Sequence, residues 1–423
     1  MAKQPNAPLL RFPEFNSDWS CLKYGSIFSF RSTNSFSREN LNYADGQVKN
    51  IHYGDIHTKF STLFDITNEE VPFVNPEIEL KNVPDDNYCR IGDLILADAS
   101  EDYADVGKCI EIVNLNNEKV VSGLHTILAR PDLHKMAIGF NGFLMQSEKV
   151  RLQIKTIAQG SKVLSISTKR IAEISLNIPQ NPEQQKIASF LTAIDTKLTQ
   201  LKQKKSLLEQ YKKGVIQKIF SQEIRFKDEN GAEYPKWEKK KLSDIADKIM
   251  YGMNAAAIAY DGENKYVRIT DIDENSRAFI PNPLTSPDGV IEEKYKLKES
   301  DILFTRTGAS VGKSYLYNRN DGNLLFAGFL IKFSIINGNP YFIFSQTLLE
   351  SYNKWIQLMS MRSGQPGINA EEYKSFSIKF PCLAEQTKIA NFLSALDEKI
   401  NHCQLQIEKM VKYKKGLLQK MFC

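Results

Sequence analysis

Two stretches of the chain carry the hydrophobic spacing of a long amphipathic helix. Taking every third or fourth residue, eight of ten positions are apolar over Ile187–Ile219, and nine of ten are apolar over Ile389–Met421. The mean step of about 3.5 residues is the coiled-coil period. Because a long helix with a single apolar seam needs a partner along its length, the pattern predicts that these two helices pair with each other. The expected seam consists of Ile187, Leu191, Ile194, Leu198, Leu201, Leu208, Ile389, Leu393, Leu396, Ile400, Ile407 and Met410.

The two helical stretches are copies of one another. At an offset of 202 residues, Pro179–Phe220 aligns with Pro381–Phe422 without a gap, and 18 of the 42 positions are identical. Weaker echoes link the segments in front of them, for example Val106-Gly107-Lys108 and Val311-Gly312-Lys313. Repetition in a fixed order is the signature of a repeated architecture. We therefore predict variable domains at 1–180 and 223–381, and helical spacers at 181–222 and 382–423.

The variable domains read as mixed α/β and rich in strands. Short β-prone runs bounded by glycine, asparagine and proline predict strands. The runs are Asp93–Ala97, Val163–Ser167, Ile174–Ile178, Asp301–Thr305, Leu330–Ile335 and Phe376–Phe380. About 38 helical residues in each spacer would make a rod of roughly 57 Å.

Composition and charge narrow the class of protein. The chain has 423 residues, of which 42% are hydrophobic, so it can build real cores. It has no long apolar run and no apolar segment near Met1, so we expect neither a membrane span nor a secretory leader. Six scattered cysteines without a C-x-x-C pair fit a reducing cytoplasm. The net charge of +5 divides into +5 on 183–220, +3 on 383–423 and −3 on the remainder.

Polar loops between the predicted strands hold the candidate chemistry. Arginine suits guanine, asparagine and glutamine suit adenine, and hydroxyl or backbone N–H groups suit phosphate. Each loop taken singly is more readily explained as an ordinary solvated loop. Glycine-rich loops that carry arginine at matching places in both halves shift the interpretation toward nucleic acid. The candidate DNA contacts are Arg31, Thr33, Arg38, Tyr53, Thr58, Lys59, Gln159, Ser161, Lys162, Arg268, Thr270, Arg306, Thr307, Ser310, Lys313, Arg362, Ser363 and Gln365.

Four motifs suggest an enzyme but lack what the chemistry needs. The run Gly308–Ser314 has three residues between its glycines, where a phosphate-binding loop has four. Asn339-Pro340-Tyr341-Phe342 departs from the methyltransferase tetrapeptide and reads as a turn into a helix. Pro287-Asp288 and Glu292-Glu293-Lys294 lie too close together for a nuclease site. The five histidines show no metal-ligand spacing.

With this layout the chain resembles the specificity subunit of type I restriction–modification systems. The resemblance rests first on the helix openings Pro179–Leu191 and Pro381–Leu393. The run Arg306–Lys313 and the aromatic openings Phe15–Trp19 and Tyr234–Trp237 are also typical of that family. The resemblance covers essentially the whole chain.

The resemblance implies an α+β (mixed) fold class with two target recognition domains in tandem. Each would read one half of a bipartite site in double-stranded DNA. The two long helices would separate and join them as an antiparallel coiled coil with pseudo-two-fold symmetry, set the distance between half-sites and dock two methyltransferase (modification) subunits. Restriction/translocase subunits would complete the complex. The chain is then expected to be cytoplasmic and non-catalytic, with S-adenosylmethionine, ATP and Mg on partner subunits and no cofactor of its own.

The first half departs from this pattern at one loop. The acidic run Ala97–Asp102 stands where the second half has Arg306-Thr307-Gly308. Acidic side chains repel phosphate, so this loop of the first half is not expected to have a DNA-binding role. Two other classes of function stay open: a scaffold whose repeated domains bind proteins, and a stand-alone methyltransferase or nuclease.

Overall fold

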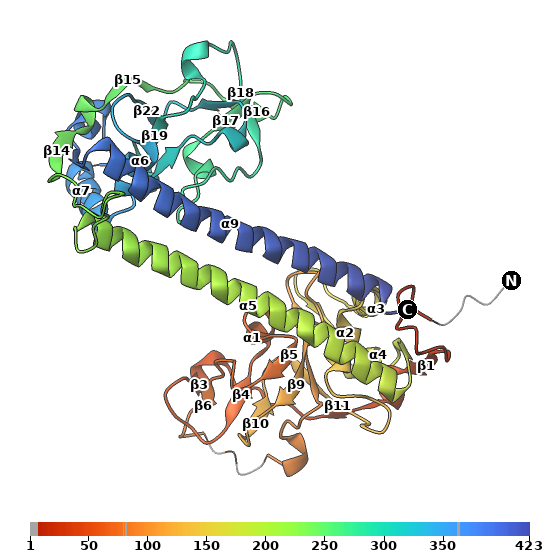
Figure 1. Cartoon of the computed structure of the whole chain (residues 1–423). Helices are drawn as coiled ribbons and strands as arrows, with labels where there is room; N and C mark the ends of the chain where they lie inside the picture. The colour runs from red at the N-terminus through yellow and green to blue at the C-terminus, as the bar shows by residue number, and fades with distance from the viewer. Residues whose placement is uncertain (1–6, 79, 81–82, 362–363) are drawn as a thin grey trace. The chain divides into compact units, whose positions relative to one another are not determined.

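The computed structural model describes residues 7–78, 80, 83–361 and 364–423 (Figure 1). They form two compact units. The first consists of Met1–Lys202 and Leu405–Cys423, and the second is Gln203–Gln404. Each unit therefore contains one variable domain together with a part of each long helix, α5 (Asn181–Phe220) and α9 (Leu383–Lys420).

The first domain is built on a five-stranded sheet in the order β2-β11-β7-β9-β5. These strands are β2 (Phe28–Arg31), β11 (Thr126–Pro131), β7 (Leu94–Ala97), β9 (Cys109–Asn114) and β5 (Leu63–Asp65). A second sheet has the order β10-β4-β6-β3, with β10 (Val120–Ser122), β4 (Lys49–Ile51), β6 (Phe73–Val74) and β3 (Leu41–Asn42). Two strand pairs complete the sheets: β1 (Ser20–Lys23) with β13 (Ser175–Ile178), and β8 (Ala99–Ser100) with β12 (Leu164–Ser165). The helices are α1 (Tyr53–Thr58), α2 (Phe140–Gln146), α3 (Glu148–Ile157) and α4 (Thr168–Ile171).

The second domain repeats this plan with fewer strands. Its main sheet has the order β15-β22-β19-β20, formed by β15 (Ala246–Tyr251), β22 (Leu330–Ile335), β19 (Asp301–Thr305) and β20 (Ser314–Leu316). The strand pairs are β14 (Glu238–Lys241) with β23 (Ser377–Phe380), β16 (Ala257–Ala259) with β18 (Thr285–Pro287), and β17 (Lys265–Val267) with β21 (Leu324–Phe326). The helices are α6 (Pro340–Gln346), α7 (Glu350–Ser360) and α8 (Ala370–Lys374).

The shared order of these elements confirms the tandem mixed α/β architecture. β2-β11-β7-β9 in the first domain corresponds to β15-β22-β19-β20 in the second. Of the strands predicted from sequence, five are present with ends shifted by no more than a residue or two. Within Val163–Ser167 only β12 (Leu164–Ser165) is a strand, because Ser167 already precedes α4.

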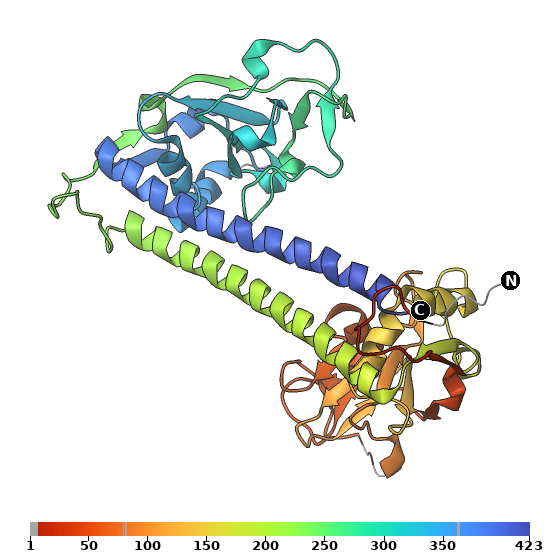
Figure 2. The same cartoon turned by 45° about the vertical axis from the view of Figure 1, so that its right-hand side comes forward.

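The two long helices run antiparallel within each unit (Figures 1 and 2). In the first unit, the beginning of α5 packs on the end of α9, and Asp195 binds Lys414 at 2.7 Å. In the second unit, the end of α5 packs on the beginning of α9, and Lys212 binds Asp397 at 2.5 Å. Both ion pairs join the same two positions of the repeat, since their members are related by the 202-residue offset. The predicted antiparallel pairing with pseudo-two-fold symmetry is therefore confirmed unit by unit.

Most of the expected seam lies in these two cores. The twelve seam positions fall in three groups of different burial. The first core contains Ile187, Leu191, Ile194, Leu198, Leu201 and Ile407, with Met410 packed against it. The second core contains Ile389, Leu393 and Leu396. Leu208 and Ile400 are half-buried.

A buried glutamate fastens each variable domain to its helix. Glu183 at the start of α5 accepts hydrogen bonds from Arg11 at 2.7 Å and from Trp19 Nε1 at 3.3 Å. Glu385 at the start of α9 accepts hydrogen bonds from Arg225 at 3.1 Å and from Trp237 Nε1 at 2.9 Å. This explains why Glu-Gln and the Phe/Tyr…Trp openings occur in both halves.

The next residue of the motif, a buried glutamine, joins each long helix to the variable domain that precedes it in the sequence. Gln184 Oε1 accepts a hydrogen bond from the Ala137 backbone N–H at 2.8 Å, and Gln386 Oε1 accepts one from the Asn339 N–H at 2.9 Å. Each amide also donates to the proline carbonyl five residues back, that of Pro179 or Pro381. The Glu-Gln motif is thus a structural joint.

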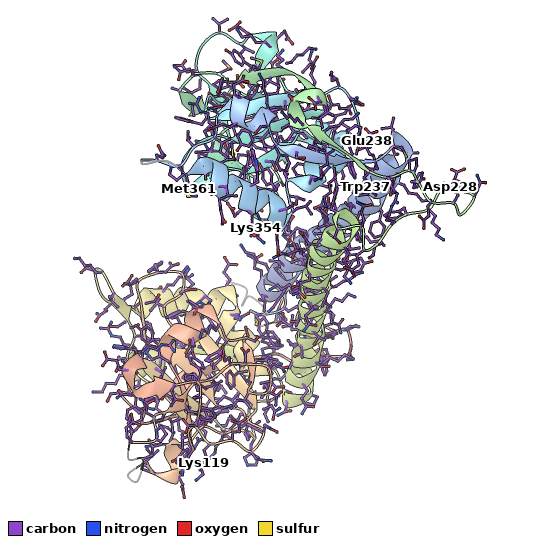
Figure 3. The ribbon with its side chains drawn as sticks, turned by 90° about the vertical axis from the view of Figure 1, so that its left-hand side faces the viewer. Lys119, Asp228, Trp237, Glu238, Lys354 and Met361 are labelled. Atoms are coloured by element: carbon purple, nitrogen blue, oxygen red, sulfur yellow. The ribbon has the colours of Figure 1, made fainter. Side chains whose placement is uncertain are left out.

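The far end of the other helix completes each joint. The Phe422 ring packs edge-on against Trp19, with centroids 6.4 Å apart, and Phe220 packs on Trp237 at 6.0 Å. Figure 3 shows Trp237 and Glu238 where the chain passes into the second domain. Each tryptophan therefore contacts the carboxylate at the start of one long helix and the phenylalanine near the end of the other.

Replacing Glu183 with alanine should destabilise the first unit by about 3 kcal/mol, because it leaves the Arg11 guanidinium without its buried partner. The measurement is the urea midpoint of proteolytic protection, with fragments of the first unit identified by mass spectrometry. Glu173→Ala is the matched control, since the Glu173 side chain is 78% exposed. An equal midpoint for both variants would contradict the assigned role of Glu183.

A second buried carboxylate gives the first domain a pH dependence. Glu111 accepts hydrogen bonds from the backbone N–H groups of Gly139 and Gly142, both at 2.7 Å, at the start of α2. Burial nevertheless raises the pKa of Glu111 from 4.5 to about 7. The folded state therefore retains a proton that the unfolded chain has lost. The stabilisation is complete below pH 4.5 and is lost as the pH rises through about 7.

We expect the first unit to lose up to about 3 kcal/mol of stability from this group between pH 5 and pH 8. Glu111→Gln should remove most of that pH dependence, although it also weakens the contact with Gly142. The measurement is the urea midpoint of the first unit at the two pH values. The exposed Glu101 supplies the control variant Glu101→Gln, which should retain the wild-type pH dependence.

Candidate nucleic-acid interface

Three loops meet at one edge of the main sheet in the second domain. Arg306 directly follows β19, and its backbone N–H donates to the Phe329 carbonyl at 3.1 Å. Its own carbonyl accepts a hydrogen bond from the Ile368 N–H at 2.9 Å. The loop after β19 is therefore joined to the turn before β22 and to the loop before α8.

The first domain joins its loops with the same backbone hydrogen bonds. The Asp98 N–H donates to the His125 carbonyl at 3.0 Å, and the Asp98 carbonyl accepts from the Ile166 N–H at 2.9 Å. Asp98 is therefore the structural equivalent of Arg306, and His125 is the structural equivalent of Phe329. Ile166 and Ile368 are related by the 202-residue offset of the helical repeat.

Arginine and aromatic side chains lie on this edge of the second domain. The Arg306 guanidinium stacks 4.8 Å from the ring centroid of Tyr251, which is 40% exposed. Phe329 is 59% exposed and Met361 is 67% exposed, at the end of α7 (Figure 3). Among the residues that the structure describes, no carboxylate pairs with Arg306.

The two polar loops of this edge are held together by backbone contacts. The Gly308 N–H donates to the Pro366 carbonyl at 3.0 Å, and Thr307 forms an isolated bridge with Gly367. Gly308 has a φ of +72°, and a side chain there would come within 3.1 Å of Gln365 Nε2. The structure thus brings together Arg306, Thr307 and Gln365; Arg362 and Ser363 lie outside the described residues.

Other candidates of the second domain are held by carboxylates. Arg268 binds Asp271 with two hydrogen bonds, at 2.7 and 2.9 Å. Lys313 Nζ lies 2.7 Å from Glu274. Thr270 Oγ1 lies 3.4 Å from Asp271 Oδ1, and the Ser310 carbonyl accepts a hydrogen bond from the Thr305 hydroxyl. These candidates are therefore engaged in contacts within their own domain.

The first domain also holds most of its basic candidates in ion pairs. Arg38 and Lys59 both bind the buried Asp55, at 2.7 and 3.4 Å. Arg31 binds Asp86 at 2.5 Å. The Thr58 hydroxyl donates to the Gly54 carbonyl at 2.8 Å.

The remaining candidates of the first domain lie on exposed loops or in an aromatic cluster. Thr33, Gln159, Ser161 and Lys162 are exposed. The Gln159 N–H donates to the Ser165 carbonyl at 2.9 Å, which holds its loop beside β12. The Tyr53 ring lies between three histidine rings, His52 at 4.6 Å, His125 at 5.3 Å and His57 at 6.1 Å.

Four residues of these edges are missing from the sequence-based list: Asp98, His125, Tyr251 and Phe329. The sequence signal for Asp98 was the acidic run Ala97–Asp102, which stands where the second half has Arg306-Thr307-Gly308. His125 has a φ of +53°, a conformation that residue types other than glycine adopt uncommonly. Its position depends on backbone hydrogen bonds between distant loops, which no local pattern encodes.

The motifs set aside as enzymatic have structural roles. Gly308–Ser310 forms a short 3₁₀ turn, and Asn339 caps α6 by accepting a hydrogen bond from the Phe342 N–H at 3.1 Å. Within the described residues, no three histidine, cysteine or acidic side chains are placed to hold a metal ion. In the same part of the chain, no helix is both long and apolar enough to cross a membrane.

Comparison with known proteins gives a consistent set of similarities. The family model described as type I restriction modification DNA specificity domain matches residues 16–210 and again 234–411. A putative type I restriction enzyme MjaX specificity subunit of Methanocaldococcus jannaschii is 24% identical over 338 residues, covering 78% of this chain and 77% of that protein. The EcoKI specificity subunit of Escherichia coli K12 is 24% identical over 314 residues, covering 67% of this chain and 64% of that protein.

Solved structures share the fold. The crystal structure of the S subunit of a type I restriction–modification system from M. genitalium aligns over 99% of both chains, with a TM-score of 0.59 and 14% sequence identity. A chain from a study of complex assembly and conformational transition of a type I system aligns over 95% of this chain and 96% of its own length, with a TM-score of 0.54 and 13% identity.

Proposed function

This chain belongs to the family of type I restriction modification DNA specificity domains, of which it carries two, and we propose that each domain reads one half of a bipartite DNA site. The observation that carries the proposal is the repeated three-loop edge. It occupies the same position of the sheet in both domains, and in the second it presents Arg306 stacked on Tyr251 without a carboxylate partner among the described residues. An arginine held in this way retains its fork of donors for guanine O6 and N7.

The long helices set the spacing between the half-sites in this proposal. Both are continuous across the boundary between the units, and Asp195–Lys414 and Lys212–Asp397 fix their register in each unit. Half-sites read from one face of the duplex lie about 34 Å apart. A continuous helix of 40 residues is roughly 60 Å long, which exceeds this distance.

The same helices offer a repeated surface for two methyltransferase subunits. Tyr211 is 54% exposed and Tyr413 is 53% exposed, at equivalent positions of the repeat. Three residues further on, a Cβ atom added to Gly214 or Gly416 would meet no atom within 4 Å apart from the nearby backbone of its own helix. An open glycine one turn from an exposed tyrosine, present on both helices, suits two copies of one partner.

We assign the chemistry to the partner subunits. The chain itself is a non-catalytic, cytoplasmic component, and the methyltransferase subunits bind S-adenosylmethionine and flip the target base out of the stack. ATP and Mg belong to the restriction/translocase subunits. The family supports this division, since the model that matches both halves of the chain is described as a DNA specificity domain.

Arg306→Ala should weaken binding to the second half-site by roughly 10-fold, the worth of a good bidentate base contact. Binding should be measured with the chain assembled with its methyltransferase partner, on duplexes altered in one half-site at a time. Arg319→Ala is the matched control, since Arg319 is an exposed arginine of the same domain paired with Glu299. If Arg306→Ala affects both half-sites equally, the arginine contacts the backbone and not a base.

Adding one turn to both helices should lengthen the preferred spacer. Four residues inserted near Ser206 and near Cys403, at one level of the antiparallel pair, add roughly 6 Å, or about two base pairs. Methylation mapping of the recognised sites measures the spacer directly. An insertion near Ser206 alone is the control, because it disrupts the register of the pair. An unchanged spacer in the double insertion would refute the role of the helices as a ruler.

A further inference from the structure

Asp98 and Arg306 occupy one structural position in the two domains. In the sheets, Ala97 pairs with Thr126 and Thr305 pairs with Leu330, so the residues that follow β7 and β19 are in register. The backbone of Asp98 makes the same two hydrogen bonds as that of Arg306. One joins it to the turn before the neighbouring strand of the sheet, β11 or β22, and the other joins it to the loop before a short helix, α4 or α8. The backbone is thus the same, and the side chain has the opposite charge.

The described residues do not satisfy the full hydrogen-bonding capacity of the Asp98 carboxylate. Its side chain is 29% exposed, and Oδ1 lies 3.3 Å from His125 Nδ1, within ion-pair distance. Oδ1 is nevertheless buried without a hydrogen bond from the described residues, because the imidazole is not aligned with it. Burial raises the pKa of Asp98, an effect that His125 only partly offsets. The carboxylate therefore lacks a well-aligned donor.

The surroundings of Asp98 are aromatic and weakly charged. The Tyr53 ring packs edge-on against His125, with centroids 5.3 Å apart, and His52 and His57 lie on other sides of Tyr53. Lys108 is the counterpart of Lys313 in the sequence repeat. Its ammonium group donates a hydrogen bond to the His57 carbonyl at 2.6 Å and therefore has a structural role. Only His125 is recorded in an ion pair with Asp98 among the described residues.

We propose that this one position selects opposite base chemistry in the two half-sites. In the first domain, Asp98 beside His125 accepts a hydrogen bond from the amino group of a cytosine or an adenine. In the second domain, Arg306 beside Tyr251 donates to guanine O6 and N7. The assignment rests on the proposed function, and it follows from the groups themselves: a carboxylate accepts from base amino groups, and a guanidinium donates to guanine.

This assignment also accounts for the acidic loop of the first domain. A carboxylate near a phosphate is repelled, but a carboxylate facing a base edge meets a donor. The neighbouring imidazole of His125 limits the cost of bringing a negative charge toward DNA. Asp98 is thus a base reader whose carboxylate, although it lies beside His125, receives no well-aligned hydrogen bond from the described residues.

Base analogues test the assignment without altering the protein. The full chain, assembled with its methyltransferase partner, first selects its sites from a library of random duplexes. Each base pair of the selected half-sites is then replaced by an analogue, either one that lacks the amino group of cytosine or adenine, or 7-deazaguanine. We expect roughly 10-fold weaker binding when one amino group is removed from the first half-site, and when one guanine N7 is removed from the second.

Variants link each effect to its residue. Asp98→Ala should accept all four bases at the amino-dependent position and become insensitive to the amino-lacking analogue there, while its preferences in the second half-site are unchanged. Glu101→Gln, which removes an exposed charge from the same loop, should select the wild-type sequence. Arg306→Ala should lose only the sensitivity to 7-deazaguanine in the second half-site.

The outcomes separate this inference from the proposed function. If the wild-type complex selects no bipartite sequence, the proposed function fails. If it selects one, but no position of the first half-site depends on an amino group, the assignment to Asp98 is overturned. The same holds if Asp98→Ala binds DNA with every preference of the first half-site intact.

Discussion

The arrangement of each unit depends on one buried ion pair at the start of a long helix. A carboxylate in a protein interior is costly unless a cation and further donors satisfy it. Glu183 and Glu385 are both buried, and each accepts hydrogen bonds from an arginine and a tryptophan of the segment that leads into its domain. Because each tryptophan also packs on the phenylalanine near the end of the other helix, one interaction orients three segments that are far apart in sequence.

The polar pairs along the helices add register to this orientation. An apolar seam alone tolerates a shift by one turn, whereas Asp195–Lys414 and Lys212–Asp397 would each be separated by such a shift. The side chains of Lys212 and Lys414 are only 16% and 18% exposed, so neither ammonium group finds much water when it loses its partner. Because the helical repeat supplies both members of both ion pairs, it specifies the antiparallel arrangement of the helices and also their alignment.

Sequence patterns predicted the helices, their pairing and most strands, because these depend on local periodicity and on repetition that the chain itself displays. They predicted the reading surface less completely. Arg268, Arg306 and Lys313 look equivalent in sequence, yet two of them are held by Asp271 and Glu274, and only the stacked one is left for a ligand. Whether a basic side chain has a partner depends on which loops the fold brings together. The same reason hid Asp98 and His125, whose relation is a backbone hydrogen bond between loops 27 residues apart.

The division between joint and reader explains how one chain can carry two domains of different chemistry. The joint uses the helix start, the preceding arginine and tryptophan, and the buried glutamine, and none of these residues belongs to the three-loop edge. The backbone of the position after β7 or β19 is held by hydrogen bonds to the backbone carbonyls and N–H groups of the neighbouring loops. A backbone hydrogen bond does not depend on the side chain, so aspartate and arginine are held equally well there. Under the proposed assignment, base preference at this position can therefore change by substitution while the register of the helices and the anchoring of the domains stay as they are.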